Sequence, residues 1–98
     1  MSNVFAGQDP AEYKTINRSV RIGGHSTSIQ LESAYWDFLD KYAASRGLST
    51  AKLVSSVYDD AVHMRGKIPN FASVLRTSCL LYLNRAKSDA TPPKVLQS

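Results

Sequence analysis

The sequence contains very little cysteine and no long apolar segment. Its one cysteine, Cys79, excludes a disulfide within the chain and fits a reducing compartment such as the cytoplasm. The longest apolar run, Cys79–Leu83, has five residues, whereas a membrane-spanning helix needs about 20. We therefore expect a cytoplasmic protein without a membrane partner, in which Cys79 is a buried structural thiol.

The sequence also lacks the residue patterns of catalytic and metal sites. His25 and His63 lie far apart and share no metal-ligand spacing with Cys79. Gly23-Gly24 lacks the lysine and the strand–turn–helix frame of a phosphate-binding loop. Asp59-Asp60 are adjacent, and adjacent helical side chains do not face each other. We therefore expect no enzyme activity, no cofactor and no metal ion.

The size and charge of the chain limit its possible functions less strongly than these missing patterns do. Ninety-eight residues correspond to one small domain, so a partner chain could help to bury its apolar surface. The formal net charge of +4 permits a nucleic-acid partner. It does not require one, because many small basic proteins bind no nucleic acid.

The two ends of the chain differ in composition from its centre. Residues 1–15 mix glycine, proline and charged residues without periodicity, which predicts a flexible arm. This segment also lacks the apolar centre of a signal peptide. Residues 88–98 contain Pro92-Pro93 and predict a disordered tail. The folded domain is therefore expected to cover residues 16–87.

Residues 26–31 alternate small polar and apolar side chains, as a strand with one buried face does. Residues 16–22 are rich in β-forming side chains, and Gly23-Gly24 between the two runs is typical of a hairpin turn. A hairpin would form these pairs on one polar face: Arg21 with Ser26, and Ser19 with Ser28. The alternative interpretation is a flexible basic arm with a glycine hinge.

A first helix is expected directly after this strand, over residues 34–46. Ser33 is suited to its N-cap and Asp37 to its first turn, where a negative charge favours the helix dipole. Gly47 supplies the left-handed stop. Its apolar stripe consists of Tyr35, Trp36, Phe38, Leu39, Tyr42 and Ala43.

Two further helices follow. Ser49 or Thr50 caps the second, which ends at residue 64 or 65, and Asn70 caps the third, which covers residues 71–87. The apolar face of the second is Leu53, Val54, Val57, Tyr58, Ala61 and Val62, and that of the third is Phe71, Val74, Leu75, Cys79, Tyr82 and Leu83.

This order of elements resembles the ribbon-helix-helix domain. The resemblance rests on Ser28–Glu32, Tyr35-Trp36, Leu39, Ala43, Gly47–Ser49 and Leu53-Val54. Gly24–Ser28 and the third helix, with Val74–Arg76, are similar to a bacterial subfamily that has an additional C-terminal helix. The similarity extends from Arg18 to Leu83. It implies an α+β, mostly helical fold that forms an intertwined homodimer.

In this family, one strand from each of two chains forms a two-stranded ribbon that enters the major groove of double-stranded DNA. A second copy would also give the strand a hydrogen-bonding partner, which a lone strand lacks. By resemblance, the base-contacting residues are Ser26, Ser28 and Gln30, of which Gln30 can bond adenine N6 and N7. Thr27, Ile29 and Leu31 would then face the core.

The resemblance also implies a phosphate clamp at the start of the second helix. Backbone N–H groups of Ser49, Thr50 and Ala51 would bind phosphate, with Lys52 nearby. The strand triad departs from the family pattern, because family strands often carry Arg or Lys and this triad is neutral. Phosphate attraction is therefore assigned to Arg18, Arg21, His25, Arg46 and Lys52.

The function implied is sequence-specific DNA binding by a transcriptional regulator, a repressor that blocks polymerase. Two other functions stay open. An antitoxin-like or adaptor protein would bind a protein partner through a flexible end, for which the arm with Val4, Phe5 and Tyr13 is the better candidate. A dimeric interaction domain that has lost DNA binding would explain the neutral triad.

Overall fold

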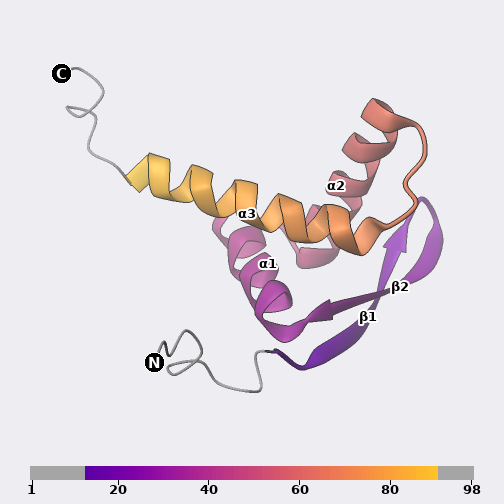
Figure 1. Cartoon of the computed structure of the whole chain (residues 1–98), viewed down its shortest axis with the longest axis horizontal. Coiled ribbons are helices and arrows are strands. Elements are labelled where there is room, and N and C mark those ends of the chain that lie inside the picture. The colour runs from indigo at the N-terminus through magenta and orange to yellow at the C-terminus, as the bar shows by residue number, and fades with distance from the viewer. Residues whose placement is uncertain (1–12, 91–98) are drawn as a thin grey trace, which may run out of the picture.

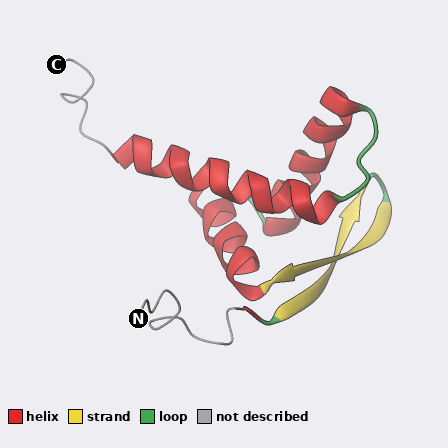
Figure 2. Ribbon diagram, viewed as in Figure 1, coloured by secondary structure: helices red, strands yellow, loops and turns green. Residues whose placement is uncertain are grey.

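The computed structural model describes residues 13–90, with side-chain surroundings up to Lys87. Residues 1–12 and 91–98, which hold most of the predicted arm and tail, lie outside the described part. The described chain is an antiparallel hairpin followed by three helices, with the hairpin at one end of the helical layer (Figure 1, Figure 2). This arrangement confirms the predicted α+β, mostly helical fold with a third helix.

The hairpin is formed by β1 (Thr15–Ile22) and β2 (His25–Glu32), joined by Gly23-Gly24. Both glycines have a positive φ, 57° and 82°, which a type I′ turn requires and other residues rarely adopt. The register contains both predicted pairs, Ser19 with Ser28 and Arg21 with Ser26. The hairpin interpretation is therefore confirmed, and the flexible basic arm was wrong.

Alternate side chains of the hairpin pack against the helices. Ile29 and Leu31 of β2 are 4% and 0% exposed, and Val20 and Ile22 of β1 are each 5% exposed. These four residues share one face, because cross-strand partners point to the same side of a sheet. Thr27, predicted to face the core, lies on this face and is half-buried. The opposite face is left to polar side chains.

α1 (Ser33–Ser45) begins directly after β2. Its N-cap is Glu32, whose side chain makes no capping bond, so the prediction that Ser33 caps this helix was wrong. The Ser33 N–H instead donates to the Lys14 carbonyl (2.7 Å) and extends the hairpin ladder by one bond. Asp37 consequently lies beyond the first turn, which contains no acidic residue. The helix therefore starts where the pairing of the hairpin ends.

The other helix ends follow the sequence signals. Gly47, with a φ of 72°, ends α1. Ser49 caps α2 (Thr50–Arg65) by accepting a bond from the backbone N–H three residues on, at 3.1 Å. Asn70 caps α3 (Phe71–Ala90) in the same way, also at 3.1 Å. α3 continues to Ala90, three residues beyond its predicted end at residue 87.

One apolar cluster connects all five elements. Its buried members are Val20, Ile22, Ile29, Leu31, Trp36, Leu39, Ala43, Leu53, Val54, Val57, Leu75 and Cys79. α3 closes this core by packing against both α1 and α2 as well as β2. Burial raises the pKa of the Cys79 thiol to about 11, which keeps it protonated at neutral pH. Within residues 13–90, no helix is long and apolar enough to cross a membrane.

Candidate nucleic-acid interface

The outward face of the hairpin carries six exposed polar side chains in three cross-strand pairs. These pairs are Asn17 with Gln30, Ser19 with Ser28, and Arg21 with Ser26. We call this set the ribbon face. All six side chains alternate with the buried ones, so the core below holds them in position. The three predicted base-contacting residues, Ser26, Ser28 and Gln30, therefore lie together on one exposed surface.

A hydrogen bond links the two strands across the ribbon face. The Ser28 hydroxyl donates to Asn17 Oδ1 at 2.6 Å. This bond uses the only proton of the hydroxyl, so the Asn17 amide N–H groups and the Ser28 oxygen lone pairs stay available to a ligand. Sequence reasoning missed Asn17, although the same glycine-turn register that paired Ser19 with Ser28 also pairs Asn17 with Gln30.

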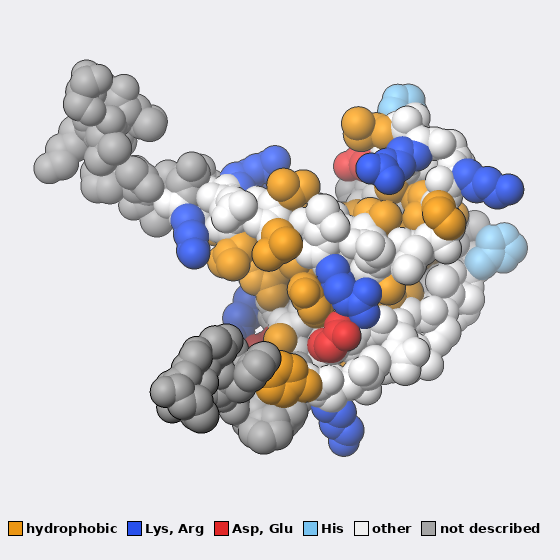
Figure 3. All heavy atoms as spheres, in the orientation of Figure 1, with side chains coloured by type: hydrophobic (Ala, Val, Ile, Leu, Met, Phe, Trp, Pro, Cys, Tyr) orange, Lys and Arg blue, Asp and Glu red, His pale blue; other side chains and the backbone are white. Residues whose placement is uncertain are grey.

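The charges around the ribbon face favour an anionic or polar ligand. Arg21 lies on it, and its guanidinium donates to the Gly24 carbonyl at 3.0 Å. The carboxylate at the far end of β2, Glu32, is held by Arg76 at 3.0 Å, and this bond lowers the pKa of the Glu32 carboxyl. Figure 3 shows the hairpin side of the molecule as mostly uncoloured surface, while hydrophobic side chains gather over the helices.

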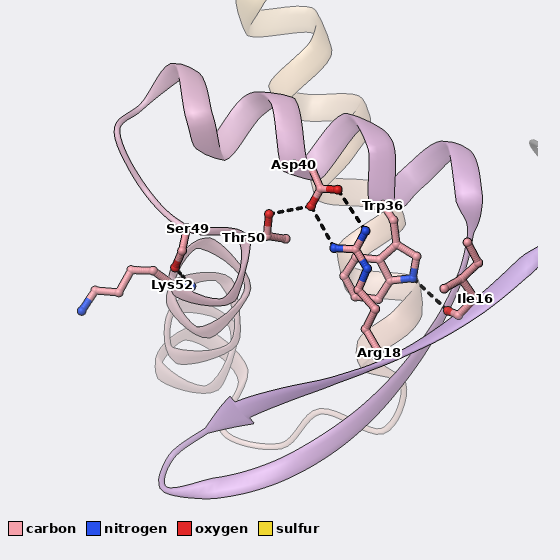
Figure 4. Close-up of polar contacts among 7 residues, drawn as sticks. All are labelled: Ile16, Arg18, Trp36, Asp40, Ser49, Thr50 and Lys52. Atoms are coloured by element: carbon pink, nitrogen blue, oxygen red, sulfur yellow. Dashed lines mark hydrogen bonds and ion pairs between the residues drawn. The ribbon is translucent and has the colours of Figure 1, made fainter.

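Arg18 lies on the opposite face of β1, pointing towards α1 (Figure 4). Its two terminal nitrogens donate to Asp40 Oδ1 and Oδ2, each at 2.9 Å. These hydrogen bonds raise the pKa of Arg18 and lower the pKa of the Asp40 carboxyl. The guanidinium also stacks over the Trp36 ring, 4.6 Å from the ring centroid. The structure therefore separates Arg18 from Arg21 on the ribbon face and holds it at Asp40, which also binds Thr50.

Asp40 connects the hairpin to the start of α2. In addition to the two bonds from Arg18, its Oδ1 accepts a bond from the Thr50 hydroxyl at 2.6 Å (Figure 4). Trp36, one turn earlier on α1, donates from Nε1 to the Ile16 carbonyl of β1 at 2.9 Å. Two adjacent turns of α1 thus hold β1, and one of them also holds the first residue of α2.

The start of α2 offers free backbone donors. Ser49 Oγ accepts the Lys52 N–H, and the Ser49 carbonyl accepts the Leu53 N–H at 3.0 Å. No hydrogen bond within the described residues uses the N–H groups of Thr50 and Ala51. Free N–H groups and the helix dipole make such an end suited to phosphate. The Lys52 side chain extends away from this turn (Figure 4).

The remaining predicted phosphate-contacting residues lie apart from these two places. His25 follows the glycine turn and is exposed, but its position in the register places it on the same face as Ile29 and not on the ribbon face. Arg46 donates to the Tyr42 hydroxyl at 2.9 Å. The structure thus brings together Ser26, Ser28, Gln30 and Arg21 on one surface, and Ser49, Thr50 and Lys52 on another.

The comparisons with known proteins agree with this geometry. A family model described as a ribbon-helix-helix domain matches residues 15–83. The chain belongs to the ribbon-helix-helix family. A solved structure of an uncharacterized protein from Bordetella pertussis Tohama I is similar, with a TM-score of 0.80 and 35% identity. That similarity covers 91% of this chain and 71% of the Bordetella chain. The search of curated proteins gave no match.

Membership of the ribbon-helix-helix family limits the classes of function. The family generally consists of DNA-binding transcription regulators and antitoxins, and it is typically non-enzymatic. Its members typically bind DNA as dimers. In this ribbon-helix-helix chain, β1 of the same molecule is hydrogen-bonded to one edge of β2.

Asp40→Asn is expected to lower the free energy of unfolding by about 1 kcal/mol at pH 7, because it weakens a bidentate but part-exposed ion pair. Arg18 lowers the pKa of the folded Asp40 carboxyl, so this stability is present above the ordinary carboxyl pKa of about 4 and is lost as pH falls through the folded value. Urea unfolding between pH 3 and 7 should show a shallower acid limb for the variant.

The matched control for this prediction is Glu32→Gln, which breaks the other hairpin-to-helix ion pair without touching α2. Glu32→Gln should flatten the same acid limb, since Arg76 also lowers the pKa of that carboxyl. Only Asp40→Asn should disturb the Thr50 position as well. Equal acid limbs for Asp40→Asn and wild type would contradict a role of this pair in stability.

Proposed function

We propose that this protein is a sequence-specific DNA-binding transcriptional regulator, and that it represses by occupying its site. The observation that supports the proposal is the ribbon face, which is an exposed polar surface on a two-stranded hairpin. The other face of the hairpin packs against the helices through Val20, Ile22, Ile29 and Leu31. Paired strands lie about 4.8 Å apart, so such a ribbon fits the roughly 12 Å width of the major groove.

Base readout is assigned to β2. Gln30 carries a donor and an acceptor that match N6 and N7 of adenine, and Ser26 and Ser28 can accept from or donate to several bases. Arg21 lies beside Ser26 on the ribbon face and adds a positive charge at that end. These contacts would supply specificity, while attraction to the DNA backbone must come from elsewhere.

Phosphate binding is assigned to the N–H groups at the start of α2, with Lys52 and Arg21 adding charge. Arg18 donates to both carboxylate oxygens of Asp40, so we instead propose that it holds the hairpin against α1. We further propose that the protein acts in the cytoplasm as a homodimer on a palindromic or repeated site. The family's usual dimeric binding supports this assembly.

The proposal is tested by selecting duplexes from a randomised library at near-physiological salt. A recurrent motif is the expected result. Gln30→Ala should lower affinity for that motif about tenfold to a hundredfold and relax the preference at one adenine, since a bidentate contact contributes about 1–3 kcal/mol. Asn84→Ala, at an exposed position of α3, is the control and should change neither. Recovery of no motif would favour a protein-partner role.

Thr50→Pro should keep the fold but weaken DNA binding about tenfold, because it removes one charge-assisted N–H donor. Proline is tolerated here since Thr50 is the first residue of α2. The change also removes the hydroxyl bond to Asp40, so Thr50→Val, which keeps the N–H, is the control. Affinity measured by fluorescence anisotropy should fall more for proline than for valine. Equal losses would remove this N–H from the phosphate site.

A further inference from the structure

A groove of about 640 Å³ lies between the C-terminal half of α2 and one side of α3. The two helices are joined by residues 66–70, and the end of α2 stands apart from α3 (Figure 1). Figure 3 shows an indentation of the surface at this place, with basic and hydrophobic side chains around it. Small side chains on both walls, Ala61 of α2 and Ser78 of α3, leave this space open.

Both walls of the groove carry side chains at helical spacing. The wall positions are Val57, Ala61 and Met64 of α2, and Val74, Ser78 and Leu81 of α3. In each helix these are residues i, i+4 and i+7, so they lie on one face. Met64 is 84% exposed and Leu81 is 58% exposed. Exposed apolar side chains that gather in a groove rimmed by polar residues mark an interaction surface.

The length and the walls of the groove suit a partner helix. α3 lines the groove from Ser73 to Arg85. At about 1.5 Å per residue this distance is roughly 18 Å, which is about three turns of a helix. A helix of that length presents apolar side chains at i, i+3 or i+4, and i+7. A partner strand would find no sheet edge here, because the backbone groups of both walls are already bonded within their helices.

The charges around the groove favour an acidic partner. Arg65, Lys67 and Arg85 line the groove, and Asp60 is the one acidic residue of the lining. All four side chains are exposed, and the ion pairs within residues 13–87 leave the three cations without a carboxylate. An apolar floor between cations matches a helix with an apolar stripe and acidic flanks. A DNA backbone would match the cations alone and would leave the apolar floor uncovered.

The groove is separate from the edge of β2 that does not pair with β1. A smaller groove of about 420 Å³ borders that edge, and its wall includes Ala72 and Arg76 of α3. Each residue turns a helix by about 100°, which places Leu81 and Arg85 on the opposite flank of α3. The larger groove is lined by α2, α3 and their connection, without residues of the hairpin. A second copy that pairs with β2 would therefore approach the other flank of α3.

We propose that the groove between α2 and α3 binds an acidic amphipathic helix of another protein. The apolar stripe of that helix would pack against Met64 and Leu81, and its acidic side chains would pair with Arg65, Lys67 and Arg85. Binding there leaves the ribbon face and the start of α2 uncovered. The protein would thus hold a protein partner through its folded helices and not through a flexible end.

The test measures how the full chain binds two synthetic helical peptides of about 14 residues. Both have leucine at i, i+3, i+4 and i+7; one has glutamate at the flanking positions and the other has lysine. In fluorescence anisotropy at physiological salt, the glutamate peptide is expected to bind at least about tenfold more tightly. Failure of the glutamate peptide to bind, or equal affinities for the two peptides, would overturn the proposal.

Two adjacent leucines of α3 provide a matched pair of variants. Leu80 and Leu81 are 59% and 58% exposed, but only Leu81 lines the groove. Leu81→Glu should lower affinity for the glutamate peptide at least about tenfold, and Leu80→Glu less than about twofold. Both changes lie at exposed positions, so both proteins should fold, which Trp36 fluorescence in a urea titration checks. Equal losses of affinity would overturn the proposal.

A second pair of variants tests the charge of the groove. Arg85→Glu should weaken binding of the glutamate peptide several-fold more than Lys41→Glu, which makes the same change in charge at an exposed position of α1. Equal losses would mean that the peptide responds to the net charge of the protein. That result would also overturn the proposal.

Two measurements distinguish the other occupants of the groove. The chain has two methionines, so carbon-13 labelling of their methyl groups should give a Met64 signal that shifts with the glutamate peptide. The same shift with a random-sequence duplex would assign the groove to DNA and overturn the proposal. Sedimentation should give equal masses for wild type and Leu81→Glu. A dimeric wild type with a monomeric variant would show that a second copy fills the groove, which would overturn the proposal as well.

Discussion

Replacing Leu31 by aspartate is expected to abolish cooperative folding. Leu31 is 0% exposed and lies on the face of β2 that packs against the helices. Truncating a buried leucine alone costs about 2–5 kcal/mol, and burying an unpaired carboxylate adds several more. A domain of this size is stable by only about 5–15 kcal/mol, so the sum removes most or all of that stability.

The measurement is a urea titration followed by tryptophan fluorescence. Trp36 is the one tryptophan of the chain and is 1% exposed, so its emission reports on the core. The control is Ser28→Asp, which places the same charge on the same strand but on the exposed ribbon face. A Leu31→Asp protein with an unfolding midpoint near that of wild type would contradict the assignment of the buried face.

Ser28→Asp is expected to abolish DNA binding, with an affinity loss of at least about a hundredfold, while the fold is kept. Ser28 lies at the centre of the ribbon face, opposite Ser19, and its hydroxyl bonds Asn17. An aspartate there would bring a negative charge into a groove bordered by about one phosphate charge per 1.7 Å of helix axis. It would also remove the hydroxyl proton that is donated to Asn17 and place two acceptor oxygens there.

The control for this prediction is Asn84→Asp, which makes the same change in net charge at an exposed site. Asn84 lies in the half of α3 that extends away from the hairpin (Figure 1). Fluorescence anisotropy with the selected duplex should show only a small, salt-dependent loss for this variant. If the two aspartate variants bound equally well, the ribbon face would not be the DNA-contacting surface.

Local signals in the sequence predicted most of the fold. The Gly23-Gly24 pair fixed both the turn and the register, because few other residues adopt the positive φ that a type I′ turn needs. Ser49 and Asn70 cap the helices that they were expected to cap, and Gly47 ends α1. In each case the residue's own backbone or side-chain chemistry decides the structure, so neighbours in sequence suffice.

What sequence reasoning missed depends on residues that are distant along the chain. Arg18 and Asp40 are separated by 22 positions, and no spacing rule predicts that they form a pair. The predicted cap of α1 was wrong by one residue: Glu32 occupies the cap position, and Ser33, whose N–H bonds the Lys14 carbonyl just before β1, is the first helical residue. Asn17 is a different case, because the predicted register already pairs it with Gln30. The predicted polar face included only Arg21 and Ser19 of the first strand and left Asn17 out.

The alternation of the hairpin has a consequence for how this protein can evolve or be redesigned. Residues that carry stability and residues on the ribbon face are immediate neighbours in sequence, yet they occupy separate sides of the sheet. Exposed substitutions away from caps and ion pairs usually change stability by only about 0.5 kcal/mol. The chemistry of the ribbon face can therefore change within residues 17–30 without new core mutations. A library at the six ribbon-face positions should yield mostly folded proteins.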